Sequence, residues 1–424
     1  MKRTWIMLLF LTASSALLLV ACKGRMPNSE LHQHPDSELH PAEKKGKWGF
    51  VNHKGKAVIR YQYTAVGPFK EELAAVCSGG ELDEARVSPF YEPSGVRNGK
   101  WGFIDRNGQM VVPQKFADVK SFSEDKAWVR AYQSDSVLGS WGVIDRKGNW
   151  LVQPQFKGGN LYQNGFADAQ SEKSGLWGII FPTGQWAVPP KYQSVQQQAK
   201  GKAIAKDKKG TFLIAFPGQR ELAGPYAAIR SFNDSLAIVV NPEGLCGVIN
   251  IEGKLLVPAK YKTISSYHEG RAFFESEGKF GFFDSAGEVV ISPKYAHVGN
   301  FQEGFAPVEK AGKFGFVNAQ GEEVVPVVLD GATGYTHGQA LICMGCKHDS
   351  GGELTYGYPD HFTGGKAALI DLEGKVYPIE GKEPQVIKNK RFLLQRGIST
   401  FQMDTLNQLL KEITPISLED FADQ

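Results

Sequence analysis

A short phrase built around Trp-Gly returns along the chain, and this repeat constrains the fold more than any other feature. It reads KWGFVNHKGKAVIRYQY from Lys47, KWGFIDRNGQMVVPQKF from Lys100 and KFGFFDSAGEVVISPKY from Lys279. Nine copies align on the position of the Trp, at Trp48, Trp101, Trp141, Trp177, Thr211, Cys246, Phe280, Phe314 and Ala367. Most successive copies start 34 to 40 residues apart. Such a period predicts one supersecondary unit per copy, with each unit covered by its neighbours.

Several positions hold the same kind of residue in most copies. Seven residues after the Trp position every copy has Gly, and four residues after it seven copies have Asp or Asn. An aromatic residue stands 15 residues after it in seven copies, and Ala stands 26 residues after it in all eight complete copies. We expect the Gly to supply the positive φ of a tight turn, and the Asp or Asn to close an Asx turn.

The runs on either side of this turn have the composition of β-strands. Segments such as WGFID and MVVP are short and β-rich, and together they predict a hairpin. The Pro after MVV is expected to end the second strand, because Pro has no N–H for the ladder. A later run such as GFAPVEK predicts a third strand that leads through a second hairpin into the next Trp. Each copy is therefore predicted to form a three-stranded antiparallel meander, followed by a connection with two aromatic residues.

The Gly directly after the Trp lies inside a predicted strand, where Gly weakens the strand. We expect it there so that an aromatic ring of the neighbouring copy can lie flat on the backbone. Phe280, Phe314 and Cys246 replace the Trp in three copies. Since a cofactor-binding or catalytic aromatic would not tolerate these replacements, the position is interpreted as a packing position.

This pattern resembles the bacterial WG (or KWG) repeat family, which is found in secreted proteins and lipoproteins. The resemblance covers residues 47–379, and the copies at Thr211 and Ala367 depart from it because they lack both Trp and Gly. It implies a binding or scaffolding array and brings no catalytic residues. The expected fold is all-β, an array of about nine repeats over residues 46–381. We favour an open twisted β-solenoid, because the period is shorter than the roughly 40–45 residues of a usual propeller blade; a β-propeller is the alternative.

Residues 1–21 have the features of an export signal. Two basic residues precede an apolar run of about 16 residues, which is shorter than the roughly 18–20 residues that span a membrane. The run ends in LVAC, which resembles the lipobox of bacterial lipoproteins and implies acylation of Cys22. Lys23 in place of Asp implies sorting to the outer membrane. The chain is thus expected in the bacterial cell envelope, held to the membrane by an N-terminal lipid.

The two ends of the mature chain differ from the repeats. Residues 22–45 are polar and contain three Pro, which predicts a flexible tether. Its three His, at positions 32, 34 and 40, are interpreted as solvated, with a weak metal site as the alternative. Residues 382–424 are predicted to form a C-terminal cap with a short helix, Gln402–Ile413, whose apolar residues have helical spacing. A partner-binding role for that helix is the alternative.

Two copies carry an additional segment, which begins 29 residues after the Trp position at Cys77 and at Cys343. The two inserts share the phrase SGGEL. Because long loops on a repeat scaffold often bind ligands, we predict binding loops here. The candidate residues are Phe90, Tyr91, Tyr356, Tyr358, Asp360, His361 and Phe362.

The inserts also contain three of the four cysteines that follow Cys22. A disulfide between Cys343 and Cys346 is expected in an exported protein. A zinc site that adds His348 and Cys77, and free thiols, are the alternatives. A bond from Cys77 to either of the other two would require the ends of the array to meet, as in a propeller.

Composition and motifs narrow the function. The chain has 48 Lys and Arg against 45 Asp and Glu, spread evenly, so no basic surface for nucleic acid is predicted. No phosphate-binding loop, zinc-protease helix or nucleophile elbow is present, so neither a cofactor nor catalysis is expected. The expected function is a lipid-anchored envelope module that binds a protein or a glycan. A purely structural envelope spacer is the alternative, and a polysaccharide-active enzyme is less favoured.

Overall fold

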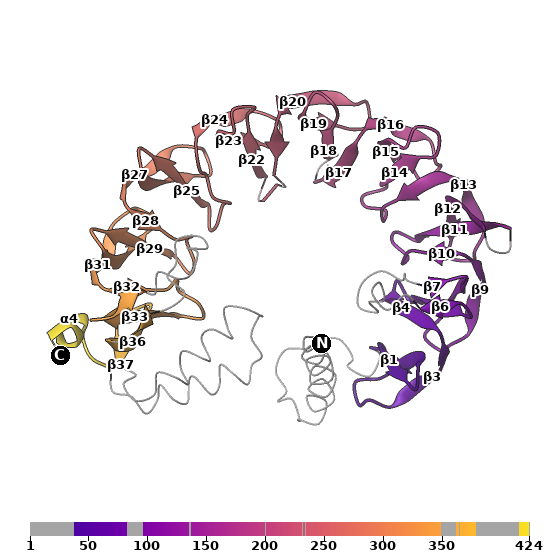
Figure 1. The fold of residues 1–424 in the computed structure, drawn as a ribbon, viewed down its shortest axis with the longest axis horizontal. Coiled ribbons are helices and arrows are strands. Elements are labelled where there is room, and N and C mark those ends of the chain that lie inside the picture. The colour runs from indigo at the N-terminus through magenta and orange to yellow at the C-terminus, as the bar shows by residue number, and fades with distance from the viewer. Residues whose placement is uncertain are drawn as a thin grey trace, which may run out of the picture. The chain divides into compact units, whose positions relative to one another are not determined.

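The protein is described here by a computed structural model. It describes residues 38–82, 96–134, 137–199, 201–230, 232–233, 235–348, 362–363, 365–378 and 415–423. The chain divides into two compact units, Met1–Lys208 with Ala215–Arg220 and Lys209–Ile214 with Glu221–Gln424. Nearly all of the regular structure is β-strand, as the repeat predicts (Figure 1).

The strands are short and numerous. The first eighteen are β1 (His40–Lys44), β2 (Lys47–Val51), β3 (Ala57–Tyr63), β4 (Ala65–Lys70), β5 (Leu73–Ser78), β6 (Glu81–Leu82), β7 (Val96–Arg97), β8 (Lys100–Ile104), β9 (Met110–Phe116), β10 (Asp118–Val119), β11 (Lys126–Ser134), β12 (Val137–Asp145), β13 (Trp150–Gly159), β14 (Ala167–Ser171), β15 (Trp177–Ile180), β16 (Trp186–Tyr192), β17 (Ser194–Gln198) and β18 (Lys202–Lys206).

The remaining strands are also short, and one helix follows them. They are β19 (Thr211–Ala215), β20 (Arg220–Tyr226), β21 (Ala228–Ile229), β22 (Leu236–Val240), β23 (Cys246–Asn250), β24 (Leu255–Tyr261), β25 (Arg271–Ser276), β26 (Lys279–Asp284), β27 (Val289–Tyr295), β28 (His297–Val298), β29 (Phe305–Lys310), β30 (Lys313–Asn318), β31 (Glu323–Leu329), β32 (Gly331–Ala332), β33 (Gln339–Met344), β34 (Lys347–His348), β35 (Phe362–Thr363), β36 (Lys366–Asp371), β37 (Val376–Pro378) and α4 (Leu418–Asp423).

The sheets are antiparallel and have mostly three or four strands, but their limits differ from the predicted meander. In the order β28-β29-β30-β31, the first two strands come from the end of one sequence copy and the last two from the start of the next. The three-stranded meander predicted within one copy is therefore wrong in its limits. The strand after the Asx turn is usually the last strand of its sheet. In four places the chain then begins the next sheet with a strand of two residues, β10, β21, β28 and β32. Most sheets remain separate, as in an open array, but in the first unit the pairing of β13 with β14 joins two of them into one seven-stranded sheet, β10 to β16. Among the described residues no sheet closes into a barrel.

The turn predicted inside each copy is confirmed. All nine Gly seven residues after the Trp position have positive φ, for example Gly108 at +80°. The carboxylate of Asp105 accepts the N–H groups of Asn107 at 2.9 Å and Gln109 at 2.8 Å. The same pair of bonds recurs at Asp284 and at Asn318. The sequence position therefore fixes the Asx turn in both units.

The Gly after the Trp has a different cause from the one predicted. A Cβ on Gly49 would lie 2.5 Å from the carbonyl oxygen of Ile59, and one on Gly142 would lie 2.6 Å from that of Val152. Those carbonyls belong to the next strand of the same sheet, where the register shifts at a bulge. The expected aromatic ring from a neighbouring copy is therefore wrong. The closest approach is made by backbone of the same sheet, and the ring that also lies near Gly142, that of Trp150, belongs to the same copy.

The Pro of the repeat lies inside a strand and does not end it. Pro113 is the fourth residue of β9, which continues to Phe116. The register of β8 and β9 shifts around it, with Trp101 opposite Phe116 and Phe103 opposite Val112. The missing N–H is tolerated because the bulge interrupts the ladder there and β9 is the last strand of its sheet.

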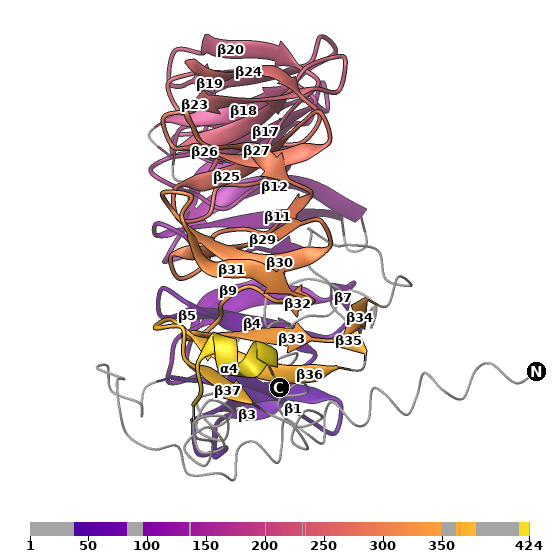
Figure 2. The same cartoon turned by 90° about the vertical axis from the view of Figure 1, so that its left-hand side faces the viewer.

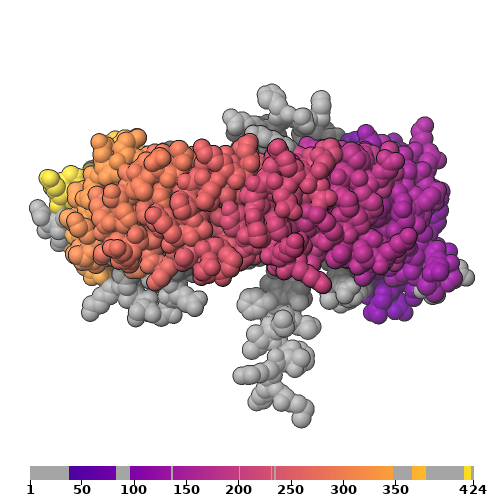
Figure 3. All heavy atoms as spheres, turned by 90° about the horizontal axis from the view of Figure 1, so that it is seen from above, coloured from indigo at the N-terminus to yellow at the C-terminus, as the bar shows by residue number. Residues whose placement is uncertain are grey.

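Neighbouring sheets bury their apolar faces against each other. One core cluster joins Trp101, Phe103 and Phe116 of one sheet to Val119 and Phe122 of the next. The ring of Phe122, from the connection, lies 4.8 Å from that of Phe103. In the second unit Phe301 packs on Phe282 in the same way, at 5.0 Å. On the face drawn in Figure 3, successive repeats of each unit accordingly lie side by side as consecutive bands.

Both ends of the described array are closed by short segments. His40–Lys44 pairs antiparallel with Lys47–Val51, so β-structure is present before residue 45, the predicted end of the tether. At the other end Ile416 bridges to Val376, and the buried Phe421 of α4 belongs to the last core cluster. Figure 2 shows α4 beside β37. Helix α4 was not predicted; the predicted helix Gln402–Ile413 lies outside the described residues.

Candidate functional site: the insert edge

The turns of each sheet lie at the two opposite ends of its strands, and the two sets of turns differ. In a four-stranded antiparallel sheet, the turns joining strands one to two and three to four lie at one edge, and the turn joining strands two to three lies at the other. We call the first the turn edge and the second the insert edge. Along the described residues the insert edge comprises the turns at 45–46, 172–176, 207–210, 241–245, 277–278 and 311–312, the described parts of the two inserts, and the β11–β12 hairpin.

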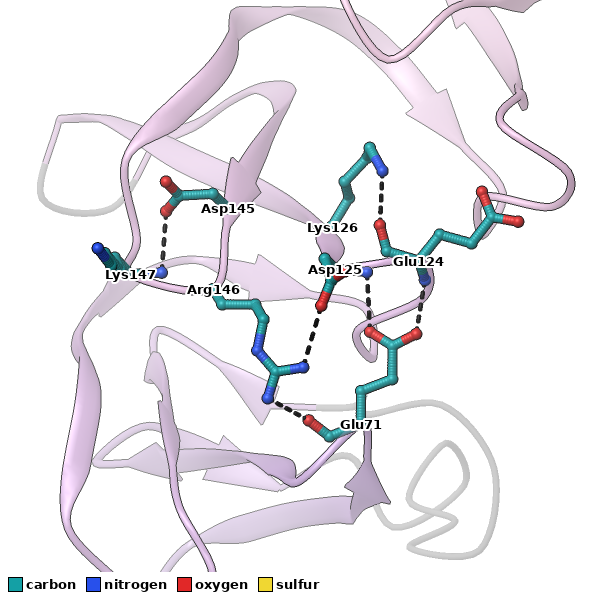
Figure 4. Close-up of polar contacts among 7 residues, drawn as sticks. All are labelled: Glu71, Glu124, Asp125, Lys126, Asp145, Arg146 and Lys147. Atoms are coloured by element: carbon teal, nitrogen blue, oxygen red, sulfur yellow. Dashed lines mark hydrogen bonds and ion pairs between the residues drawn. The ribbon is translucent and has the colours of Figure 1, made fainter.

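The turn edge is uniform, and carboxylates tie its turns together from one sheet to the next. The carboxylate of Glu71 accepts the backbone N–H of Glu124 at 2.6 Å and that of Asp125 at 2.9 Å (Figure 4). Arg146 adds to this contact, donating to the carbonyl of Glu71 at 2.6 Å and to the carboxylate of Asp125 at 3.1 Å. Glu124 in turn accepts the N–H of Gly165 at 2.8 Å.

The second unit repeats this carboxylate ladder. Glu269 accepts the N–H groups of Glu303 at 2.6 Å and Gly304 at 2.8 Å, and Glu303 accepts those of His337 at 2.6 Å and Gly338 at 2.7 Å. Every acceptor stands 23 residues after a Trp position. Glu at that position in four copies was an available signal that the sequence analysis did not use. The ladder satisfies the turn N–H groups, so the turn edge is a structural surface.

All large variation in length falls on the insert edge. The insert that begins at Cys77 leaves the sheet between β5 and β8 through the short pair β6–β7, with Glu81 opposite Arg97. The insert that begins at Cys343 leaves between β33 and β36 through the equivalent pair β34–β35, with Lys347 opposite Thr363. The related sequences thus occupy the same place in two sheets, one in each unit.

The base of the first insert is built on close backbone packing. A Cβ on Gly80 would lie 2.5 Å from the nitrogen of Gly99, and a Cβ on Gly99 would lie 2.5 Å from the sulfur of Cys77. Cys77 is a buried free thiol. Burial and the nearby Asp118 raise its pKa to about 12, so it stays protonated and unreactive at neutral pH.

A long hairpin beside the first insert was not predicted. Strands β11 and β12 extend the insert edge of the next sheet, and the hydroxyl of Tyr132 donates to the carbonyl of Gly99 at 2.8 Å. Val137 and Leu138, near the hairpin tip, are 51% and 50% exposed. In the first unit, therefore, two adjacent sheets extend at the same edge, and the hairpin carries exposed apolar side chains there.

One half-buried and one buried acid of the first unit, Asp118 and Asp168, stand among apolar positions. Burial raises the pKa of Asp118 to about 6, and its carboxylate accepts the N–H of Val119 at 3.0 Å. Burial also raises the pKa of Asp168, which accepts hydrogen bonds from Gln197 at 3.0 Å and Asn160 at 3.3 Å. In the part of the chain that the structure describes, no group of three or more His, Cys, Asp or Glu residues could hold a metal ion.

The predicted site residues fall mostly outside the described part of the chain. This applies to Cys22 and to six candidate loop residues, Phe90, Tyr91, Tyr356, Tyr358, Asp360 and His361. Phe362 lies in β35, opposite His348 in the stalk of the second insert. Cys343 and Cys346 are joined by a disulfide. Over the described residues, no helix has both the length and the apolar character needed to cross a membrane.

Comparisons with known proteins give a family and only weak structural likenesses. No curated protein matches the chain. Similar solved structures include a crystal structure of the eukaryotic initiation factor (10% identity, covering 80% of this chain and 95% of that one, TM-score 0.34) and BamB from Moraxella catarrhalis (11%, 75%, 96%, 0.24). Hsv2p from Kluyveromyces lactis is a third (11%, 61%, 93%, 0.26). With TM-scores under 0.5, these likenesses carry no argument.

The family defined as "WG containing repeat" matches seven segments that together make up more than half of the chain. They are residues 48–81, 101–131, 141–173, 177–212, 247–280, 280–314 and 314–345. No matched segment starts at Thr211 or Ala367, the two copies whose sequences depart from the pattern. The chain belongs to the WG-containing repeat family.

Proposed function

We propose that the protein is a lipid-anchored binding module of the bacterial cell envelope, and that its insert edge recognises a protein or glycan partner. The observation that carries this proposal is the contrast between the two edges. The turn edge keeps short turns whose N–H groups are held by the ladder from Glu71 and from Glu269. The insert edge receives both inserts and the long β11–β12 hairpin.

This contrast favours recognition over a purely structural spacer. A spacer needs only the stacked sheets, and inserts on one edge add nothing to its length or stiffness. Long loops held by a rigid repeat scaffold are a common way to build a binding surface. The exposed Val137 and Leu138 beside the first insert supply apolar area of the kind that interfaces use. No catalytic step is proposed, because the half-buried Asp118 and the buried Asp168 are hydrogen-bonded to neighbouring groups of the sheet.

Shortening the insert edge tests the proposal. Residues 79–99 and 345–365 can each be replaced by Ala-Gly, the turn that the chain itself uses at 311–312 between the paired Lys310 and Lys313. Ser78 and Lys100, and likewise Met344 and Lys366, are paired in the same register, so the replacement closes each sheet with a native-type hairpin. Both variants should keep the melting behaviour of the parent protein.

The readout is affinity capture from solubilised membranes. The parent protein should retain one partner at stoichiometric level, and the shortened variants should lose it. A matched control is the variant Glu277→Ala, which alters a short turn of the insert edge without shortening it and should keep the partner. Retention of the same partner by both shortened variants would refute the insert edge as the binding surface. Absence of any stoichiometric partner from the parent protein would favour the spacer.

A further inference from the structure

We propose that the Cys343–Cys346 disulfide is a redox-sensitive anchor for the β34–β35 stalk of the second insert, which a dithiol reductant releases. The inference is independent of the proposed binding function, because it concerns the local order of the stalk. It rests on where the disulfide lies, what else holds its loop, and how the first insert differs.

The disulfide joins the sheet directly to the start of the stalk. Cys343 lies in β33, opposite Ala367 of β36, and is 2% exposed. Cys346 is 9% exposed and immediately precedes β34. The covalent bond therefore fixes the point at which the second insert leaves its sheet. Breaking it frees Cys346 to move relative to β33.

A polar contact holds the same loop from outside. The carboxylate of Asp330 accepts the N–H of Gly345 at 2.7 Å and pairs with the ammonium group of Lys313 at 2.5 Å. Lys313 lowers the pKa of Asp330, so the acceptor is ionised at neutral pH. The N–H of Asp330 donates to the carbonyl of Cys343 at 2.9 Å. The loop is thus held by the disulfide and by the charge-assisted hydrogen bond from Gly345 to Asp330. Reduction removes only the disulfide.

The first insert occupies the equivalent place without a cross-link. Gly80 stands where the second insert has Cys346, and a Cβ there would collide with the backbone of Gly99. Cys77, the equivalent of Cys343, is a buried free thiol. The β6–β7 stalk is therefore held without a cross-link, by backbone packing and by Leu82 and Val96 against the core cluster, and a reductant changes neither contact. Redox sensitivity is confined to one of two related inserts, and the other is an internal control.

The chemistry is thiol–disulfide exchange. A thiolate of the dithiol attacks one sulfur of the Cys343–Cys346 bond and forms a mixed disulfide, and its second thiol then displaces the protein sulfur. The protein takes up two electrons and two protons and ends with two thiols. The reductant leaves as its own disulfide, so no further reactant is needed.

Amide hydrogen exchange on the full mature protein, with and without dithiothreitol, tests the proposal. After reduction, the amides of Lys347, His348 and Thr363 should exchange about tenfold faster or more, because the stalk opens without global unfolding. The amides of β6 and β7 should not change. Equal acceleration of both stalks, or no acceleration of β34–β35 once mass spectrometry shows full reduction, would overturn the proposal.

A variant makes the test independent of reductant access. Cys346→Ser removes the bond while leaving the buried Cys343 in place, and it should show the fast stalk exchange without dithiothreitol. Cys77→Ser removes the other insert thiol and should respond to dithiothreitol as the parent protein does. Unchanged exchange in β28–β31 serves as the folding control. A Cys346→Ser stalk as protected as the oxidised parent would refute the anchor.

Discussion

The carboxylate of Glu303 accepts the N–H of His337 at 2.6 Å, while the N–H of Glu303 is itself accepted by Glu269 at the same distance. One residue thus acts as donor and acceptor in a ladder that crosses three consecutive turns. Because the acceptors are carboxylates and the donors are turn N–H groups that lack ladder partners, these bonds are charge-assisted. The ladder adds a polar contact between sheets whose faces are otherwise apolar.

We predict that Glu303→Ala lowers the stability of the second unit by about 1–2 kcal/mol, because two N–H groups lose an ionised acceptor at an exposed site. The matched control is Glu277→Ala, which changes the same residue type at nearly the same φ, +52° against +53°, but off the ladder. Thermal melts followed by circular dichroism compare the two. Equal shifts of the melting midpoint would show that the ladder contributes nothing beyond turn conformation.

Gly102→Ala should destabilise the first unit by about 1–3 kcal/mol, as overpacking of a tight contact does. The added Cβ would collide with the carbonyl of Val112 on the adjacent strand. Gly158→Ala is the control, since its nearest neighbour would be a Gln170 side-chain oxygen at 3.8 Å, and it should stay within about 0.5 kcal/mol. Urea denaturation measures both. A Gly102→Ala variant as stable as the control would contradict the bulge explanation.

Asp118 should make the first unit less stable as the pH rises from about 4 to 6. Burial raises its pKa from 3.8 to about 6, so the folded state holds the proton more tightly than the unfolded chain does. The stabilisation from the protonated form is complete below pH 4 and is lost by about pH 6. Asp118→Asn, which is neutral throughout, should reduce the difference in stability between pH 4 and pH 7 by on the order of 1–3 kcal/mol.

Melts between pH 4 and pH 7 follow this effect. Asp105→Asn is the control, because Asn occupies the same turn position at Asn52, Asn250 and Asn318. It should fold as the parent protein does, and it therefore shows the effect of an Asp-to-Asn change that keeps the turn hydrogen bonds. A profile of Asp118→Asn that overlays the parent would mean that the carboxyl group does not titrate as its burial requires.

Cys22→Ser should yield an unprocessed precursor, because the serine hydroxyl cannot replace the thiol as the acylated group. The parent protein should enter the detergent phase in phase partitioning, and a soluble form that begins after residue 37 should remain in the aqueous phase. The full-length parent found entirely in the aqueous phase would end the lipoprotein hypothesis.

The sequence predicted the local structure of the repeat better than its pairing. The spacing of Asp105 and Gly108 determines a turn, because the hydrogen bonds of an Asx turn lie within five residues. Pairing between strands is a non-local property, and the repeat does not reveal where one sheet ends and the next begins. The sequence analysis therefore did not predict why position 102 is Gly or that Pro113 lies inside a strand. Both depend on the bulge between β8 and β9.

Some missed features did have signals in the sequence. Glu71, Glu124, Glu269 and Glu303 share one position, which a search for repeated acids would have found. Ser417 accepts the N–H of Asp420 at 3.0 Å, a capping arrangement that marks the start of α4. The positions of the candidate binding residues and of Cys22 remain predictions, because they lie outside the described residues.

Each sheet combines the end of one sequence copy with the start of the next. If the coding sequence is broken at equivalent points of two copies, both breaks therefore fall at the same place in equivalent sheets. Recombination between such points would remove or add whole periods and rejoin half-sheets that match in register. Array length could therefore change by duplication without new folding solutions, and only the segments around His40 and Phe421, which close the two ends, would have to be kept. The turns of the insert edge could then change in one copy at a time, while the duplicated strands of the scaffold stay the same.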